Sequence, residues 1–474
     1  MYSKSFYFLI ILHLTIFVFS QSTTIDFTIS GTGYTISDNT VTISTDGTYD
    51  LSGSLTDKKI MVSSSSTLNL NTFSLINSGE LTPIIISSNK VVEFILTENS
   101  TLQDSTTNEK EGTIYLESGA TLKISGSGTL NINPNKFMAI NGTEGTSLTV
   151  NDGATISITS ENNNIGGIYL RNGITFSNAI YTYSCPNGAY HALDSENSIK
   201  IIKGTYNIIS GNGKGIQTEK NLYLGEENGN NSDLILNIKT SDEGIEAKGI
   251  EIYSGTISID ANEDGINAAS SDNDCDETVR CSGNCACYIK FSGGDLTLKS
   301  NEDGIDSNGD ITISGGNIVV FAATDSENQP IDQDGLLSIT GGNIIAAGSA
   351  KMEGGISGTT NQTAKIYSGT INEGVKLVIT NGDGEELKSL TTIKAASYIY
   401  FNFPTTFSVK LNGNEIALSE PSENKGNNDG KDGPFDPNRL DNHGPPGDND
   451  NNDNNNDCYI NLSKYLLIFG LILM

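Results

Sequence analysis

The chain has 474 residues and a formal net charge of −30, from 57 acidic and 27 basic side chains. This balance excludes nucleic-acid binding, because no basic surface could replace the counterions around a phosphate backbone. It favours cations as small partners, and an acidic polymer could approach only through a bridging metal ion. The 51 glycines, the absence of tryptophan and the many Ser, Thr, Asn and Ile residues are typical of short strands joined by tight turns, so we expect an all-β protein.

The first 20 residues predict secretion. Lys4 precedes an apolar run from Phe6 to Phe19, which is the pattern of a signal peptide over residues 1–20. Asn-x-Ser/Thr sequons ahead of the apolar tail fit a secreted glycoprotein. They begin at Asn99, Asn141, Asn230 and Asn361. The protein is therefore expected outside the cell or on its surface.

Residues 25–390 repeat one sequence pattern, in which short runs of strand-forming residues alternate with Gly or Asn turns. Examples are GTYNIISGNG, GTISIDANEDG and GDLTLKSNEDG. Such self-similarity predicts a solenoid. We expect a right-handed, single-stranded parallel β-helix whose inward Ile, Leu and Val side chains stack from coil to coil. Gly244 and Gly265 are 21 residues apart, which predicts coils of roughly 20 to 22 residues and about sixteen turns.

Acidic residues recur at the turns of this repeat. Gly244, Gly265, Gly304 and Gly335 each follow an acid and precede Ile or Leu. Aligning these glycines predicts one column of acids, formed by Glu243, Asp264, Asp303 and Asp334. The same alignment predicts a second column, formed by Glu246, Asn267 and Asp306, and places Asp332 level with Ser241, Asn262 and Asn301.

Stacked acids need a compensating charge. Neighbouring coils lie about 4.8 Å apart, and two bare carboxylates at that distance repel by roughly 3.5 kcal/mol at an effective dielectric near 20. Ligands that are all oxygen atoms favour calcium over zinc as the intervening ion. The alternative is that each Asp-Gly only turns the chain. The predicted calcium ligands are Glu243, Asp264, Asp303, Asp306, Asp332 and Asp334.

The interval between Gly265 and Gly304 is 39 residues, and we assign its excess to a polar side loop near 270–286. This loop holds four cysteines, Cys275, Cys281, Cys285 and Cys287. In an oxidising compartment they are predicted to form two local disulfides. A zinc site is the alternative, although the spacing of the four cysteines is irregular for one.

The C-terminal residues depart from the repeat. Residues 391–419 are predicted to form a small β cap, a final strand pair that covers the open end of the helix. Residues 420–457, rich in Asn, Asp, Gly and Pro, predict a disordered stalk. Residues 458–474 end in an apolar run of ten residues, which as a helix spans about 15 Å and is too short to cross a bilayer. Stalk and tail together match a lipid-anchor signal of the GPI type, with a frayed hydrophobic terminus as the alternative.

Two enzymatic readings stay open. The stretch NEDGID at 301–306 resembles part of the polygalacturonase motif, and paired carboxylates serve glycoside hydrolysis. The double Asp, Gly-His-Gly and Arg-x-Lys that those hydrolases also carry do not occur, and a lone histidine such as His191 is usually structural. A polysaccharide lyase would need calcium and a positioned lysine or arginine base. The candidate lysines are Lys214, Lys248, Lys290 and Lys299.

Longer segments carry a family resemblance. GTYDLSGSLTDKKIMV (47–62), NKVVEFILTENSTLQDS (89–105), SGSGTLNIN and the later DGI and SGG units resemble the bacterial carbohydrate-binding β-helix family of cellulose and polygalacturonate binders, over residues 40–350. The resemblance implies a pectate-lyase-like solenoid that binds calcium and plant-wall polysaccharide without cleaving it. Lys214 and Glu243 stand where that family usually has Asp, which puts the number of metal sites in doubt.

Aromatic side chains complete the predicted site, because sugar faces stack on flat rings. The candidates are Tyr169, Tyr181, Tyr183, Tyr190 and Tyr223. We therefore expect a monomeric, secreted, calcium-dependent binder of pectate or cellulose, with a lyase or hydrolase and a structural surface adhesin as the alternatives.

Overall fold

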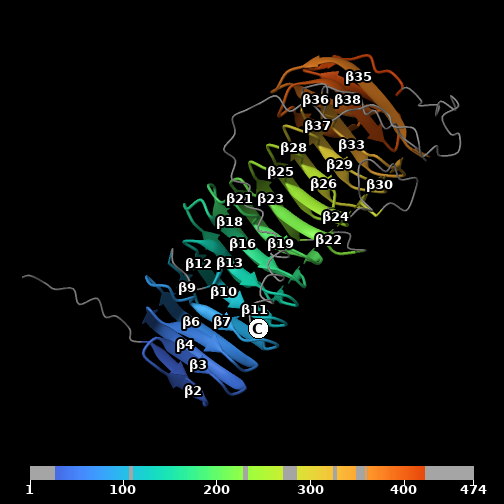
Figure 1. Cartoon of the computed structure of the whole chain (residues 1–474). Helices are drawn as coiled ribbons and strands as arrows, with labels where there is room; N and C mark the ends of the chain where they lie inside the picture. The colour runs from blue at the N-terminus through green and yellow to red at the C-terminus, as the bar shows by residue number, and fades with distance from the viewer. Residues whose placement is uncertain are drawn as a thin grey trace, which may run out of the picture. The chain divides into compact units, whose positions relative to one another are not determined.

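The computed structural model describes residues 27–105, 110–227, 233–270, 286–323, 328–348 and 361–421, and the backbone of 358–359. These residues form β-strands and turns (Figure 1). Nothing helical in this part of the chain is long and apolar enough to cross a membrane. The predicted signal peptide, the stalk beyond residue 421 and the apolar tail lie outside the described residues, so secretion and anchoring stay predictions.

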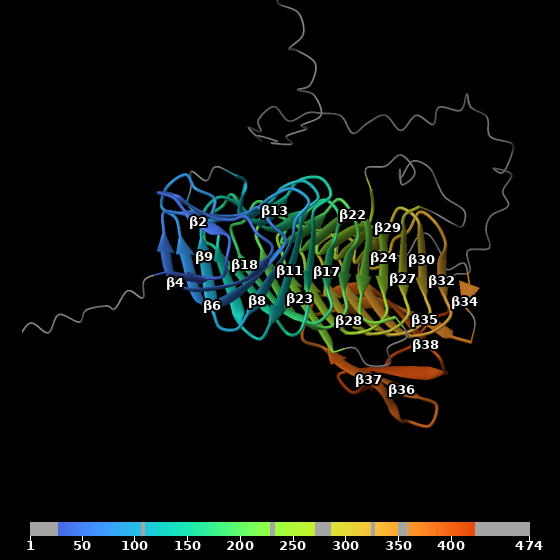
Figure 2. The same cartoon turned by 90° about the horizontal axis from the view of Figure 1, so that it is seen from below.

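Strands of successive turns pair in parallel, as predicted, and they build three faces of one solenoid (Figure 2). The first face contains β3 (Thr40–Ile43), β5 (Lys59–Val62), β7 (Ile84–Ile86), β10 (Gly112–Leu116), β13 (Phe137–Gly142), β16 (Ile165–Leu170), β19 (Leu193–Ser195), the starts of β22 (Ile216–Leu224) and β24 (Ile245–Ile252), β26 (Ile266–Ala268) and β29 (Ile305–Ser307). The second contains β8 (Val91–Leu96), β11 (Thr121–Gly126), β14 (Ser147–Val150), β17 (Ile174–Phe176), β20 (Ile199–Ile201), the ends of β22 and β24, β27 (Tyr288–Phe291), β30 (Asp310–Ile313), β32 (Leu337–Ile339) and β34 (Gly358–Thr359).

The third face contains β9 (Ser100–Gln103), β12 (Thr129–Asn133), β15 (Thr155–Thr159), β18 (Ala179–Cys185), β21 (Gly204–Ser210), β23 (Leu234–Lys239), β25 (Thr256–Asp260), β28 (Asp295–Lys299), β31 (Asn317–Phe321) and β33 (Asn343–Gly348). The long strands β4 (Gly47–Thr56) and β6 (Ser66–Ile76) run from the second face onto the third, since the start of β6 pairs with β8 and its end with β9. Each strand therefore has one neighbour in the preceding turn and one in the following turn.

The core is a set of apolar columns that run through the turns. Inward residues alternate with outward ones along each strand, because successive side chains of a strand point to opposite faces. One column on the first face is formed by Ile60, Ile84, Ile114, Ile140 and Ile168, all fully buried. Each such side chain contributes about 2 kcal/mol of hydrophobic stabilisation relative to an exposed one.

The predicted number of turns is wrong. Aligned positions such as Ile245 and Ile266 are 21 residues apart, but Ile84 and Ile114 are 30 apart, and the solenoid has about ten turns instead of sixteen. The alignment of Ile266 with Ile305 agrees with a long insertion in that turn. The sequence period came from one of the shortest coils, because loops of variable length separate the strands of the other coils.

Both ends of the solenoid are closed by antiparallel strands, which protect otherwise open sheet edges. At the N-terminal end, β1 (Thr28–Ser30) pairs with β4, and β2 (Tyr34–Ile36) pairs with β3. At the other end, β38 (Ala396–Phe403) lies between β33 and β35 (Thr363–Ile371). A separate sheet holds β36 (Lys376–Asn381), β37 (Glu386–Thr391), β39 (Phe407–Leu411) and β40 (Asn414–Glu415).

The predicted cap at 391–419 is therefore incomplete. Antiparallel structure already begins at β35, and the two long strands within 391–419, β38 and β39, belong to different sheets. The sequence pattern does not mark this boundary, because β35 carries the same Thr, Gly and Ile residues as the strands of the solenoid.

Outward side chains at the centre of each face form rows along the solenoid. On the first face we call the C-terminal part the acidic row, which consists of Asp194, Gln217, Glu246, Asn267, Asp306 and Asp332. On the third face we define the hydroxyl row as Ser54, Ser74, Thr101, Asn131, Ser157, Thr182, Asn207, Asn237, Ser258 and Thr297. The row on the second face mixes both charges, with Glu93, Lys123, Thr149, Thr175, Lys200, Tyr223, Glu251, Lys290, Thr312 and Ser338.

Three of the sequons named above fall within the described residues. Asn99 and Asn361 are exposed, as an attached glycan would require. Asn141 is only 8% exposed, and its Nδ2 donates a hydrogen bond to the Glu111 carbonyl at 2.8 Å. Modification at Asn141 is therefore incompatible with this packing, and Asn230 lies outside the described residues.

Candidate metal-binding site

Glycines at one corner of the solenoid bring acidic residues of successive turns together. A Cβ on Gly244 would lie 2.5 Å from the Gly265 carbonyl oxygen, and one on Gly265 would lie 2.6 Å from that of Gly304. The Gly244 amide donates to the Asp264 carbonyl at 2.9 Å, and the Gly265 amide to the Asp303 carbonyl at 3.0 Å. These glycines are required because backbones of neighbouring turns approach closely, and the acid before each glycine is fixed at that corner.

The corner confirms most of the predicted columns. The residues before the stacked glycines form what we call the corner column, which consists of Lys214, Glu243, Asp264 and Asp303. Glu246, Asn267 and Asp306 align on the adjacent strands, also as predicted. The two columns lie side by side at the edge of the first face.

The predicted register fails in the last turn. Ile331 bridges to Ile305, so Asp332 lies beside Asp306 in the acidic row, whereas the alignment had placed it level with Asn301. The Asp334 amide donates to the Ser307 carbonyl at 3.0 Å, which puts Asp334 outside the corner column. The alignment used Gly335 and Leu336 as a repeat unit, but Leu336 is 45% exposed and does not occupy an inward position.

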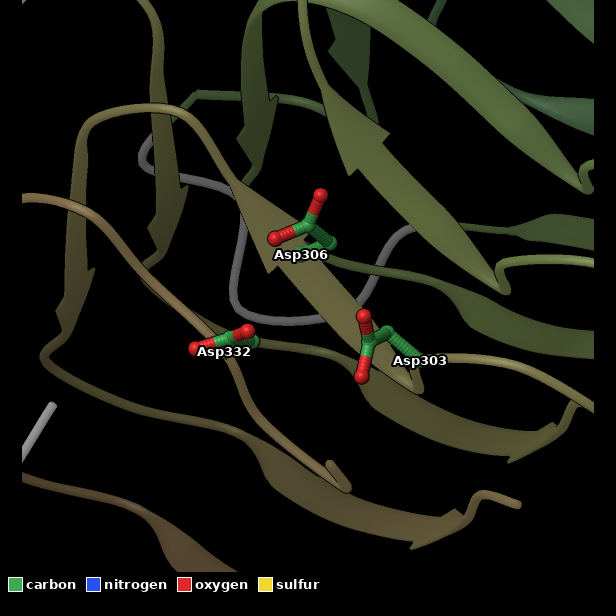
Figure 3. A group of neighbouring side chains, drawn as sticks. All are labelled: Asp303, Asp306 and Asp332. Carbon is green, nitrogen blue, oxygen red and sulfur yellow. The ribbon is translucent and has the colours of Figure 1, made fainter. Parts of the chain in front are cut away.

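This corrected register brings three carboxyl groups together. One oxygen from each of Asp303, Asp306 and Asp332 lies within 4.8 Å of the others, and all three residues are half-buried. Figure 3 shows these groups gathered around one space, Asp303 and Asp306 from one turn and Asp332 from the next. The cluster has the donor type and spacing that a calcium ion binds.

Burial and like charge make this cluster unfavourable when all its members are ionised. Burial, followed by repulsion from Asp264, Asp303 and Asp332, raises the pKa of Asp306 well above its ordinary value. Burial and the Asp303 charge raise the pKa of Asp264 to about 7. A bound cation or a proton would relieve the same repulsion, because each removes negative charge from the site.

A neutral oxygen beside the cluster also lacks a partner. Asn267 lies between Glu246 and Asp306 in the acidic row, and its Nδ2 donates to Glu243 Oε1 at 3.3 Å. Its Oδ1 is buried and accepts no hydrogen bond. An unsatisfied buried acceptor is costly, and a cation would satisfy it, so the residues present fit calcium.

Lys214 supplies a cation within the protein one turn before the acids. Its Nζ lies 3.0 Å from Glu243 Oε2 and also contacts Glu246. Burial opposes the charged form of Lys214, but the Coulomb attraction of both glutamates outweighs it and raises the pKa of the ammonium. The predicted metal ligand Glu243 is therefore paired with Lys214. The carboxylates that could share a metal ion begin only at Asp264.

His191 contacts the backbone of this lysine and has a structural role. Its Nδ1 accepts a hydrogen bond from the Lys214 amide at 2.9 Å. Burial and the nearby ammonium lower the pKa of His191 to about 4, so the ring is neutral at pH 7. The structural role predicted for this histidine agrees with these contacts.

Sequence comparison identifies the family of this solenoid. The family model described as "Carbohydrate-binding domain-containing protein" matches residues 37–232 and 231–412. The chain belongs to this carbohydrate-binding family. Among curated proteins no match is found. A solved polysaccharide lyase-like protein from C. thermocellum is similar at 17% identity, over 70% of this chain and 91% of its own, with a TM-score of 0.22.

The tyrosines predicted as sugar platforms in this carbohydrate-binding protein do not form one surface. Tyr181 and Tyr183 are fully buried in the core, so that prediction is wrong for both. Tyr190 is 41% exposed. Tyr169 is half-buried on the first face, where its hydroxyl donates to Glu196 at 2.7 Å, and Tyr223 lies on the second face under Lys200. The sequence pattern around a tyrosine is the same whether its side chain points inward or outward. Only the strand register shows which tyrosines lie in the core.

Sequence reasoning also missed members of the site. The predicted ligands do not include Asn267, although it aligns with Glu246 and Asp306, and they do not include Asp194 at the start of the acidic row. Burial, followed by the charges of Glu219 and Glu196, raises the pKa of Asp194 to about 7. The available signal was the position directly after each inward Ile or Leu of the first face, as in Ile266 and Asn267.

The predicted disulfide loop stays untested. Cys287 is fully buried next to β27, whereas Cys275, Cys281 and Cys285 lie outside the described residues. The pairing of the four cysteines stays a prediction.

Proposed function

We propose that this carbohydrate-binding protein is an extracellular monomer that holds polysaccharide through calcium and does not cleave it. The observation that carries the proposal is the cluster of Asp303, Asp306 and Asp332, whose carboxylate oxygens lie within 4.8 Å of one another. A protein with a net charge of −30 repels a polyuronate, and a bound divalent ion reverses the local field.

Asp303, Asp306 and Asp332 would hold the ion, and Asn267 Oδ1 would add a neutral oxygen. Bound calcium supplies a site for the carboxylate or hydroxyl oxygens of a sugar. The side chains of the protein orient the ion and leave one side of the site accessible, since the three carboxylates are half-buried. Pectate or polygalacturonate, from plant cell walls, is the ligand that this arrangement favours.

The surroundings of Lys214 support binding without cleavage. A lyase base must accept a proton at neutral pH, but Glu243 and Glu246 keep the Lys214 ammonium charged by raising its pKa. The neighbouring His191 uses Nδ1 to accept the Lys214 amide. Neither group is therefore available as the base beside the calcium cluster.

The experiment measures polygalacturonate binding and cleavage together. Affinity would be determined with millimolar calcium and with chelator, for the native protein and for the Asp303→Asn/Asp332→Asn double variant. We expect the double variant or chelation to weaken binding at least tenfold, and no unsaturated or reducing-end product to form.

Asp260→Asn is the matched control. Asp260 lies on the third face and pairs with Lys299 at 3.2 Å, and it belongs to neither the acidic row nor the corner column. It should bind like the native protein. Product formation would favour the lyase or hydrolase alternative, and absence of any polysaccharide binding would favour the structural adhesin.

A further inference from the structure

The hydroxyl row is an uncharged line along the third face, from Ser54 to Thr297. Every one of its ten consecutive turns presents Ser, Thr or Asn at the central outward position. At the usual spacing of neighbouring strands the row is about 40 Å long. Such a length without charge is notable in a chain with 84 charged residues, 57 acidic and 27 basic, since both other faces carry charges in their central rows.

Hydroxyl groups of the row are available to a ligand. Thr182, Ser258 and Thr297 make no side-chain hydrogen bond to the described residues, whereas Asn237 donates to Asn207 at 2.9 Å. A hydroxyl both donates and accepts. The row therefore offers a partner donors and acceptors at a regular interval.

Exposed apolar side chains flank the middle of the row. Ile180, Ile209 and Ile235 are 43%, 44% and 44% exposed. They lie on the neighbouring strands β18, β21 and β23, where Thr205 pairs with both Ile180 and Ile235. Hydroxyls interspersed with exposed aliphatic groups match the two surfaces of a pyranose ring, its hydroxyl edge and its C–H face.

The C-terminal end of the same face shows what happens when the chain covers it. The row continues from Thr297 to Val319, which is 6% exposed, and beside it from Lys299 to Phe321, which is 2% exposed. Both pack in one cluster with Leu377 of the small sheet. Where the protein packs against this face, the outward residues become apolar, so the polar row fits a hydrated partner.

We infer that the hydroxyl row is a second carbohydrate-binding surface, along which an extended, uncharged polysaccharide lies. The inference rests on the proposed function only in taking a polysaccharide as the ligand. The row has no cationic side chain that could bind a polyuronate. It also has no charged side chain that an uncharged polysaccharide would leave unpaired. An extended neutral chain can follow a straight row, placing hydroxyls on Thr182 and Asn207 and C–H groups on the exposed isoleucines.

Microcrystalline cellulose is the probe, and the Thr182→Glu/Asn237→Glu double variant of the full chain is the test. Two carboxylates placed under an uncharged ligand would lose hydration without gaining a partner. We expect binding to cellulose to weaken at least tenfold and calcium-dependent binding to polygalacturonate to remain. Thr175→Glu, on the second face between Thr149 and Lys200, is the matched control and should bind cellulose normally, as should Thr182→Ser.

The outcomes separate this inference from the proposed function. Equal cellulose binding by the native protein and the double variant, or no cellulose binding by the native protein while polygalacturonate still binds, overturns the inference alone. Loss of polygalacturonate binding on chelation with cellulose binding intact supports two separate sites. Sedimentation that shows a dimer broken by the double variant would assign the row to self-association and overturn the inference.

Discussion

The acidic row and the hydroxyl row are built by the same coils, yet they differ in what surrounds their side chains. Each places one outward residue per turn at the centre of a face. Beside the acidic row, glycines allow close packing at the corner and half-bury the carboxylates, so charge accumulates with little solvent. The residues of the hydroxyl row lie within strands and not at such a corner, and Asn207 and Asn237 are exposed. Similar geometry therefore gives a cation site on one face and a neutral surface on another.

The largest effect is expected when Lys214, the ammonium group that pairs with Glu243 and Glu246, is replaced. Lys214→Gln leaves the half-buried Glu243 and Glu246 without the ammonium that pairs with both, which should destabilise the calcium-free protein by about 3 kcal/mol at pH 7. Chemical denaturation measures this change. Lys299→Gln, which breaks the more exposed pair with Asp260, should cost less than about 1 kcal/mol. Equal losses in the two variants would contradict the difference between the faces.

Close backbone packing should be needed at the glycines of the acidic corner and not at the outward positions of the hydroxyl row. Gly265→Ala would place its Cβ 2.6 Å from the Gly304 carbonyl oxygen, and we expect a loss of about 2 kcal/mol by denaturation. Ser258→Ala, on the adjacent strand β25 in the hydroxyl row, is the comparison and should change stability little. A tolerated alanine at Gly265 would show that the turns can separate there.

The acidic row should also make stability depend on pH. The folded-state pKa of Asp194 is raised to about 7 from 3.8, so the folded protein binds this proton more tightly than the unfolded chain does. Its contribution is favourable at low pH and is lost progressively as pH rises from about 4 to about 7. Thermal unfolding of Asp194→Asn should show a smaller decrease over this range, and an unchanged pH profile would refute the assignment.

The smallest effect is expected in the hydroxyl row itself. Asn207→Ala should alter the free energy of unfolding by less than about 0.5 kcal/mol, because the side chain is exposed and contacts chiefly Asn237. Urea denaturation measures this value. A loss above about 1 kcal/mol would mean that the row stabilises the fold, and would weaken the case that it serves a ligand.

Particular residues show how far sequence reasoning reached. The glycines before Ile245, Ile266 and Ile305 gave the right alignment of Glu243, Asp264 and Asp303, because each turn there has the same local pattern. The pattern failed at Gly335, where an exposed Leu336 mimics an inward one, and Asp334 was misplaced as a result. Tyr181 and Tyr183 were misassigned for a related reason, since a tyrosine on a strand can face either side.

The sequence by itself determined the parallel solenoid, its apolar columns and the presence of an acidic corner, because these follow from local alternation and from the repeated Gly-Ile unit. Only the tertiary structure decided which acids meet, that Lys214 neutralises Glu243, and that a neutral row lies on the third face. These depend on loop lengths between coils, which set which residues of adjacent turns become neighbours and carry no periodic signal of their own.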